Sequence, residues 1–222
     1  MATDMTSKSE PTNETLALYG ADYYNPGTSK VIESPEEDLY FYRAFIGKHS
    51  IRLEKGDCLF HLSGDALIAG LDRGPLEIQS DRFAVLVRGY MPDRKTCEIR
   101  ASTNLPYVNG CSTKQIFPPE RPGDPTLQML TIPPHSSEQA HHTHSTARIV
   151  YVLEGRGVSV VGMEGLTARE ELYPGKVVIL RKFSPHHFET GDAWLTVLPV
   201  HVFSSIPQEF SHPMFHGTHI IG

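Results

Sequence analysis

The sequence has little of what stabilises secreted or membrane-spanning proteins. Its 222 residues include only 3 cysteines, Cys58, Cys97 and Cys111. They are too few and too widely spaced for a disulfide framework, and no Cys-x-x-Cys pair offers a zinc site. The longest apolar runs, such as residues 83–87, are far too short to cross a membrane. Residues 1–20 lack the apolar core of a secretion signal, so we expect a soluble cytoplasmic protein.

Positive charge is also scarce. Lysine and arginine number 20 against 26 acidic residues, which gives a net charge of −6. No run of five or six like charges appears, so the pattern does not favour a nucleic-acid or membrane partner. Histidine is the one unusual count, because ten of the 12 histidines follow residue 130.

Helical periodicity is hard to find along the chain. From residue 50 onward, short β-forming segments alternate with Gly, Pro and Asp at intervals of roughly 8–12 residues. No amphipathic helical window of about 12 residues interrupts them. This pattern is typical of antiparallel β-sandwiches and barrels, so the predicted fold class is all-β.

A proline-rich connector, residues 116–125, separates two halves of similar β character. Prolines disfavour central strand pairing and favour a surface link. We predict a mobile N-terminal arm over residues 1–30, a β half without a metal site over 31–118, a metal-binding half over 119–203 and a tail over 204–222. The first half has only His49 and His61, which are not at ligand spacing, so we expect no metal there.

Three histidines occupy the four positions from His141 to His144, directly before a β-forming run. Because side chains alternate across a strand, His142 and His144 project to one face. Neutral imidazoles that converge on a cation avoid the repulsion between charged ones. A third donor is expected from a neighbouring strand, and His186 in the segment SPHHF is the candidate.

These segments resemble the two motifs of the cupin superfamily. HTHSTARIVYVLEG is similar to the first motif, His-x-His, then glutamate, then glycine, with His142, His144, position 148 and Gly155 in register. PGKVVILRKFSPHHF is similar to the second, with Gly175, Pro185 and His186. The resemblance spans residues 127–203, with a weaker cupin-like rhythm over 50–115.

The resemblance implies a cupin (jelly-roll type) antiparallel β-barrel with a degenerate cupin-like N-terminal half. It also implies one divalent metal ion bound by His142, His144 and His186. A ligand set of three histidines is similar to that of the three-histidine iron oxygenases of the superfamily. Fe(II) is therefore the favoured metal, and Zn, Ni, Cu and Mn are alternatives because imidazole suits several of these ions.

Arg148 stands where cupins usually have a glutamate ligand. Its parity puts it on the same face as the two histidines, where a cation beside a divalent metal is unfavourable unless an anion lies between them. Glu138, Glu154, Glu189 or an anionic ligand are the candidates for that anion. Two interpretations stay open: Arg148 forms an ion pair with Glu138, or it binds an anionic group of a substrate.

The resemblance implies a metal-dependent oxygenase that acts on a small anionic organic substrate, and Arg148 is the candidate catalytic residue that would fix a carboxylate of that substrate. The alternatives are a non-redox isomerase or lyase with the metal as Lewis acid, for which His187 or Glu189 is the candidate general base, and a non-catalytic binding protein. His141 and His187 have a plainer interpretation as hydrogen-bonding residues at the barrel rim. His201 points inward as a fourth ligand or lies apart from the metal. We also expect a homodimer formed through the arm and the outer strands.

Overall fold

The computed structural model describes residues 13–34, 41–64, 68–99, 105–121, 123–163, 165–203 and 219–220. Within these ranges the protein is built almost entirely of antiparallel strands, which confirms the predicted all-β class. The helical elements here are α1 (Asn13–Leu18) and a short 3-10 turn, η1 (Val108–Gly110). In this part of the chain no helix is long and apolar enough to span a membrane.

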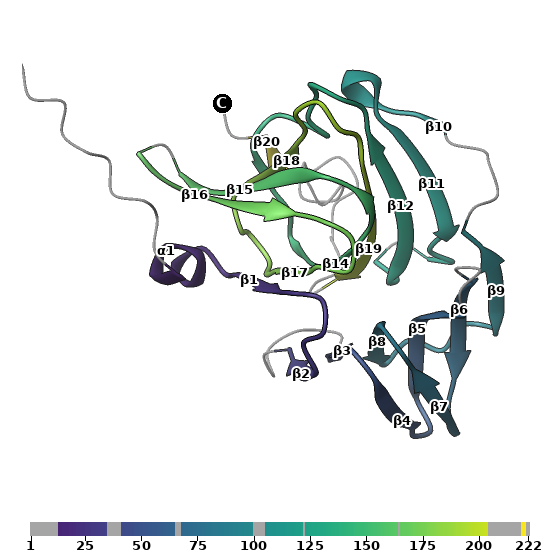
Figure 1. Ribbon diagram of the computed structural model, residues 1–222. Coiled ribbons are helices and arrows are strands. Elements are labelled where there is room, and N and C mark those ends of the chain that lie inside the picture. The colour runs from purple at the N-terminus through teal and green to yellow at the C-terminus, as the bar shows by residue number, and fades with distance from the viewer. Residues whose placement is uncertain are drawn as a thin grey trace, which may run out of the picture.

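Two sheets form the barrel, and Figure 1 shows them curving around a common interior. The seven-stranded sheet has, in spatial order, β1 (Ala21–Tyr24), β17 (Val177–Leu180), β14 (Thr146–Gly155), β19 (Leu195–Phe203), β12 (Thr126–Ile132), β11 (Ser112–Phe117) and β10 (Leu105–Pro106). The five-stranded sheet has β16 (Leu166–Leu172), β15 (Gly157–Met163), β18 (His186–Glu189), β13 (His142–Thr143) and β20 (His219–Ile220).

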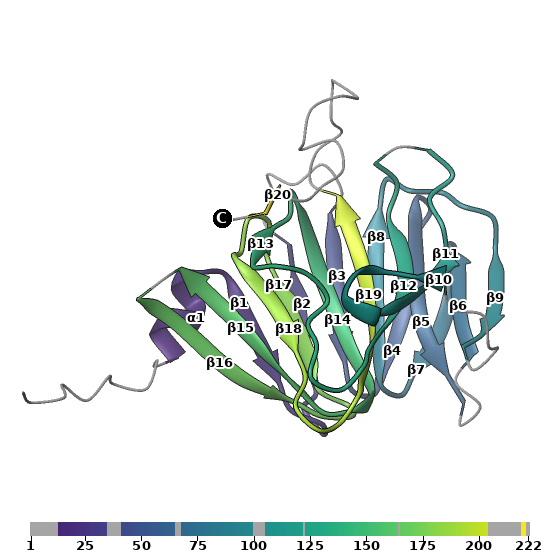
Figure 2. The ribbon, with the colours of Figure 1, turned by 90° about the horizontal axis from the view of Figure 1, so that it is seen from above.

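The first half contributes two further sheets. The six-stranded sheet has, in spatial order, β2 (Lys30–Glu33), β3 (Tyr42–Ile46), β8 (Phe83–Arg88), β5 (Asp57–Ser63), β6 (Ile68–Arg73) and β9 (Lys95–Glu98). The two-stranded sheet pairs β4 (His49–Leu53) with β7 (Leu76–Ser80). In Figure 2 the strands of the six-stranded sheet run alongside β14, β19 and β12 of the second half.

Three apolar cores lie between successive pairs of these sheets. The largest core packs the six-stranded sheet against the seven-stranded sheet, with Phe60 and Val85 from the first half and Ile149 and Val200 from the second. A second core lies inside the barrel, between the seven- and five-stranded sheets. A third lies between the six-stranded sheet and the β4–β7 pair. The seven-stranded sheet is therefore covered by apolar packing on both faces.

Strand β14 shows how one sequence serves both faces. Ala147, Ile149 and Tyr151 are buried in the core shared with the first half. The alternate residues Val150 and Val152 are buried in the barrel core. Because side chains alternate along a strand, Arg148 must share the barrel-facing side with Val150. This agrees with the parity expected from the sequence, which placed Arg148 on the face that carries His142 and His144.

Strand pairing crosses the boundaries drawn from the sequence. Ala21–Tyr24, inside the predicted arm, pairs with β17 as an edge strand of the barrel sheet. Ser112–Phe117, inside the predicted first half, pairs with β12 of the second half. Most of the predicted tail, residues 204–218, lies outside the described residues. The four-part division of the chain stays a prediction.

The shared core generates the first prediction. Ile149 is fully buried between the two halves, so Ile149→Ala should lower the free energy of unfolding by about 2–5 kcal/mol through lost burial and a residual cavity. The matched control, Ile68→Ala, removes the same atoms from a side chain that is 39% exposed and should cost less than about 1 kcal/mol. Denaturant unfolding measures both. Equal losses in the two variants would contradict a stabilising interface between the halves.

Candidate metal centre

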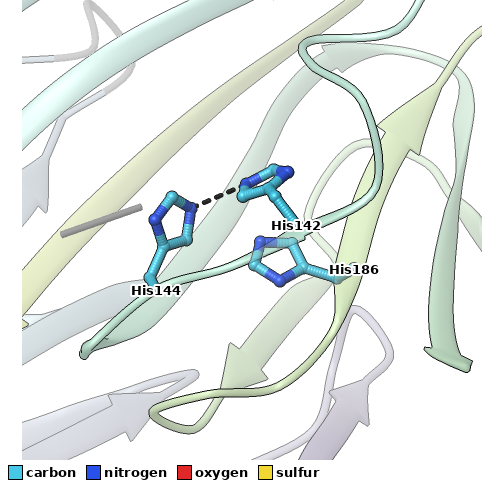
Figure 3. Close-up of side chains that lie close together, drawn as sticks. All are labelled: His142, His144 and His186. Atoms are coloured by element: carbon cyan, nitrogen blue, oxygen red, sulfur yellow. Dashed lines mark hydrogen bonds between the residues drawn. The ribbon is translucent and has the colours of Figure 1, made fainter. Parts of the chain in front are cut away.

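Three buried histidines meet at one end of the barrel. His142 lies on β13, His144 directly follows that strand, and His186 begins β18. His142 and His186 are direct cross-strand partners, which brings two of the rings together through backbone pairing alone. One nitrogen from each ring lies within 4.8 Å of the others, and Figure 3 shows the rings turned toward one another.

Backbone carbonyls determine which nitrogen of two rings is free. The Nδ1 atoms of His142 and His186 each lie 2.8 Å from a carbonyl oxygen, that of Ala140 and Ser184 respectively. A carbonyl only accepts, so Nδ1 must carry the proton and Nε2 keeps its lone pair. This is the tautomer that a metal ligand requires.

The spacing of the donors suits a single ion. The Nε2 atoms of His142 and His144 are 2.8 Å apart, and the dashed line in Figure 3 marks this contact. Two nitrogens that each bind one ion at about 2.0–2.1 Å lie roughly 3 Å from each other. Three neutral imidazoles at such distances fit a divalent transition metal. The residues present therefore fit the ion that the motif resemblance implies.

Burial keeps these histidines neutral. Burial lowers the pKa of His142 to about 4, and the positive charge of Arg148 acts in the same direction. The pKa of His144 and that of His186 are lowered as well, in both cases mainly by burial. At neutral pH the three rings can bind a cation without first losing a proton.

Arg148 lines the same cavity, which has a volume of about 330 Å³. Burial lowers the pKa of its guanidinium to about 9, so the side chain remains protonated at neutral pH. No described carboxylate forms an ion pair or hydrogen bond with it. The Arg148–Glu138 ion pair, one of the two interpretations of the sequence, is thus absent among the described residues.

Glu138 also lines the cavity, but it has a different partner. Its Oε2 atom accepts a hydrogen bond from the backbone N–H of Phe188, on the strand that carries His186. The side chain is only 6% exposed. Burial raises the pKa of the Glu138 carboxyl to about 8, against the opposing effect of the hydrogen bonds it accepts.

His187 lies on the outer face of β18, away from the cavity. Its Nδ1 is 2.8 Å from Nδ1 of His141, and its Nε2 is 3.2 Å from Oε2 of Glu189. Glu189 in turn forms an ion pair with Arg169. The structure therefore does not bring His187 together with the three ring nitrogens, and its contacts match the plainer interpretation as a hydrogen-bonding residue. Parity would have given this result, because His187 directly follows the inward His186.

His201 lies beside Arg148 on the neighbouring strand, as its direct cross-strand partner, and it lines the cavity. Burial lowers its pKa well below the usual range. It is not one of the residues whose ligand atoms converge within 4.8 Å.

Part of the cavity wall was not anticipated from the sequence. Thr113, Gln115 and Gln128 line it from β11 and β12, and Gln115 and Gln128 are direct cross-strand partners. Tyr107 and Gln139, which also line it, are hydrogen-bonded to each other. The polar positions in STKQIF and TLQML were the only available signal.

In the first half, His61 is hydrogen-bonded to Asp72, with 2.9 Å between Nε2 and Oδ2. Among the described residues of this half, no three potential metal ligands converge as they do in the second half. The absence of a metal from this half stays a prediction.

A family model for the cupin domain matches residues 128–201. The chain contains a cupin domain. This confirms the expected superfamily, and the match includes all three clustered histidines and Arg148. The comparison with curated proteins finds no match to the sequence.

Solved structures share the cupin fold over most of the chain. A variant of Bacillus subtilis oxalate decarboxylase has a TM-score of 0.53 at 10% identity, and the match covers 83% of this chain and 78% of that one. A Pseudomonas aeruginosa protein named for induction by glyoxylate has a TM-score of 0.57 at 13% identity, with coverages of 86% and 84%.

A third structure, Streptomyces albus HEPD with its substrate 2-hydroxyethylphosphonate and Fe(II) bound, has a TM-score of 0.53 at 7% identity. That match covers 86% of this chain and 78% of that one. At such low identities the likeness shows a shared fold only. It confirms the cupin barrel with a cupin-like first half.

The histidine cluster leads to a prediction about metal content. His144→Ala removes one of three donors and should reduce the bound metal to below about a tenth of that in the unchanged protein, since an ion loses a direct ligand. The fold should be retained, because the apolar cores do not include His144. The control His187→Ala alters a residue on the outer face and should keep its metal. Elemental analysis of both proteins measures this, and full occupancy in His144→Ala would refute the assignment.

The lowered pKa values predict an acid-sensitive metal-free protein. His142 has a pKa of about 4 when folded and 6.5 as its ordinary value, so between these values the unfolded chain binds more protons. Stability must then fall as pH falls from about 6.5 to 4, by about 3 kcal/mol from His142 alone. Glu138, whose pKa is raised from 4.5 to about 8, adds stability of similar size as pH falls over this window. The net fall therefore comes from His144 and His186, whose pKa values are lowered as well.

Thermal unfolding of chelator-treated protein across this pH window measures the effect. His142→Asn should flatten the pH dependence, because it removes one of the titrating groups. The control His135→Asn alters an exposed histidine and should leave it unchanged. A melting temperature that is constant from pH 6.5 to 4 would contradict the prediction.

Proposed function

We propose that this protein is a metal-dependent enzyme, an oxygenase that acts on a small anionic organic substrate. One observation carries the proposal: three neutral imidazoles converge in a cavity that also contains the cationic side chain of Arg148. No carboxylate belongs to the convergent donor set within the described residues. A site of this kind attracts anions, because none of its ligands offsets the charge of the ion.

A bound Fe(II) ion would supply redox chemistry with dioxygen, and any divalent ion would supply Lewis acidity. The residues of the chain would hold the ion and bind the substrate. His142, His144 and His186 would hold the ion, which leaves coordination positions free because they contribute only three donors. Arg148 would bind an oxoanion of the substrate through its planar fork of N–H donors. The apolar walls formed by Val150, Phe188 and their neighbours would limit access of water.

A non-redox isomerase or lyase is the second candidate, and Glu138 is the observation that favours it. This carboxyl is buried in the cavity and has a pKa of about 8, so it can exchange a proton near neutral pH. A non-catalytic binding protein is the third candidate. The small anionic substrate and the homodimer are proposals that rest on the sequence argument.

Oxygen consumption distinguishes these candidates. Protein reconstituted with Fe(II) and mixed with a panel of small carboxylates should consume dioxygen with at least one of them. Turnover that proceeds equally well without oxygen would favour the isomerase or lyase. Tight binding of a carboxylate with no turnover under either condition would favour the binding protein. Elemental analysis of protein purified without added metal identifies the resident ion.

Arg148 provides a direct prediction for this proposal. Arg148→Gln should weaken the binding of carboxylate ligands about ten- to a hundred-fold, because a charged hydrogen bond contributes about 1.5–3 kcal/mol. Metal content should stay unchanged, since Arg148 is not a ligand. Arg148→Glu should instead tighten metal binding by adding a carboxylate beside the histidines. Calorimetric titration of the metal-loaded variants measures both effects, and unchanged carboxylate affinity in Arg148→Gln would reject this role.

A further inference from the structure

The cavity contains two ionisable groups of opposite sign that are not paired with each other. Arg148 enters it from β14 of the seven-stranded sheet. Glu138 enters it beside β18 of the five-stranded sheet, where it is bonded to Phe188. The two groups therefore approach the cavity from opposite sheets of the barrel, and the histidines of β13 and β18 share this space.

Glu138 is held in place by its backbone as well as by its side chain. Its N–H donates to the carbonyl of Phe188 at 3.2 Å, and its Oε2 accepts from the N–H of the same residue. The neighbouring Ser137 forms a bridge to Glu189 on the same strand. The carboxyl is thus fixed at the cavity wall, where only one of its two oxygens has a hydrogen bond to another residue in the described structure.

A backbone N–H does not need a carboxylate as acceptor. The amide oxygen of glutamine would accept the same bond and preserve the local structure. A buried carboxyl without a cationic partner also costs more than a neutral amide. No described cationic side chain is joined to Glu138 by an ion pair. The hydrogen bond to Phe188 therefore does not by itself require an acidic side chain at position 138.

We propose that the substrate carries, in addition to the oxoanion that Arg148 binds, a hydrogen-bond donor that Glu138 accepts. The donor is a hydroxyl or an ammonium group on a small carboxylate. This inference rests on the proposed function, because it assumes that ligands bind in the histidine cavity. Val150, Leu180 and Val197 also line the cavity, and these apolar side chains suit a short carbon skeleton.

Charge complementarity supports this class of ligand. An unsubstituted carboxylate satisfies Arg148 but offers no partner to the second oxygen of the buried Glu138 carboxyl. A ligand with a donor group removes that penalty, and a site that contains a buried acceptor discriminates strongly against an analogue that lacks the donor. An ammonium group would also stabilise the ionised form of this carboxyl, which burial disfavours, and would neutralise its charge.

Three matched probes test the proposal: propionate, lactate and alanine, which differ only in a hydrogen, hydroxyl or ammonium group at the α-carbon. Protein loaded with Co(II) reports their binding through its visible absorption spectrum. Lactate or alanine should bind roughly tenfold or more tightly than propionate. Which of the two binds better distinguishes a hydroxyl from an ammonium group.

Glu138→Gln should abolish this preference while propionate binds as before, metal content should be unchanged, and the melting temperature should not fall. The matched control, Glu189→Gln, removes a carboxyl from the outer face of β18 and should keep the preference. Equal binding of all three probes to the unchanged protein would overturn the inference. So would a preference that survives Glu138→Gln, or a loss of metal from that variant, which would make Glu138 a ligand.

Failure of the proposed function gives a different result. In that case the unchanged protein would bind no metal, or no probe would alter the cobalt spectrum. Propionate binding that depends on Arg148, without discrimination at the α-carbon, would leave the proposed function intact and reject only the role of Glu138.

Discussion

The alternation of side chains along β14, between two buried faces, is the constraint on which the rest of this structure depends. One face of the seven-stranded sheet must match the first half of the chain, and the other must enclose the barrel interior. A shift of one residue would place Ile149 in the cavity and Arg148 in an apolar core, which is prohibitive for an unpaired guanidinium. The register that packs the two halves together therefore also places the guanidinium of Arg148 in the cavity.

The same logic explains how much could be predicted from the sequence. His142, His144 and Arg148 could be assigned to one face because they are close in sequence and strands have a period of two. His186 required a second motif, since nothing local connects it to His142. Gly155 illustrates the value of the motif: its φ is +81°, and a Cβ there would lie 1.9 Å from the carbonyl oxygen of Trp194, so glycine is required at this turn.

What could not be predicted depends on contacts between distant segments. Glu138 was considered as a partner for Arg148, because both are charged and near the motif. The structure pairs Glu138 with the backbone of Phe188, 50 residues away, and no local pattern carries that information. The polar wall from β11 was missed for the same reason, since residues 112–117 were assigned to the first half. His187 is a different case, because parity with His186 alone argues against a place in the cavity.

The strand that carries His142 has only two residues, and it lies between β18 and β20. The partner on the second side, His219–Ile220, comes from the last residues of the sequence. This arrangement has a consequence for the metal centre. A substitution or fusion that disturbs the pairing of residues 219–220 would act on the strand that carries His142, although these residues are far from the histidine cluster in sequence, so this pairing becomes an experimental variable in any measurement of metal affinity.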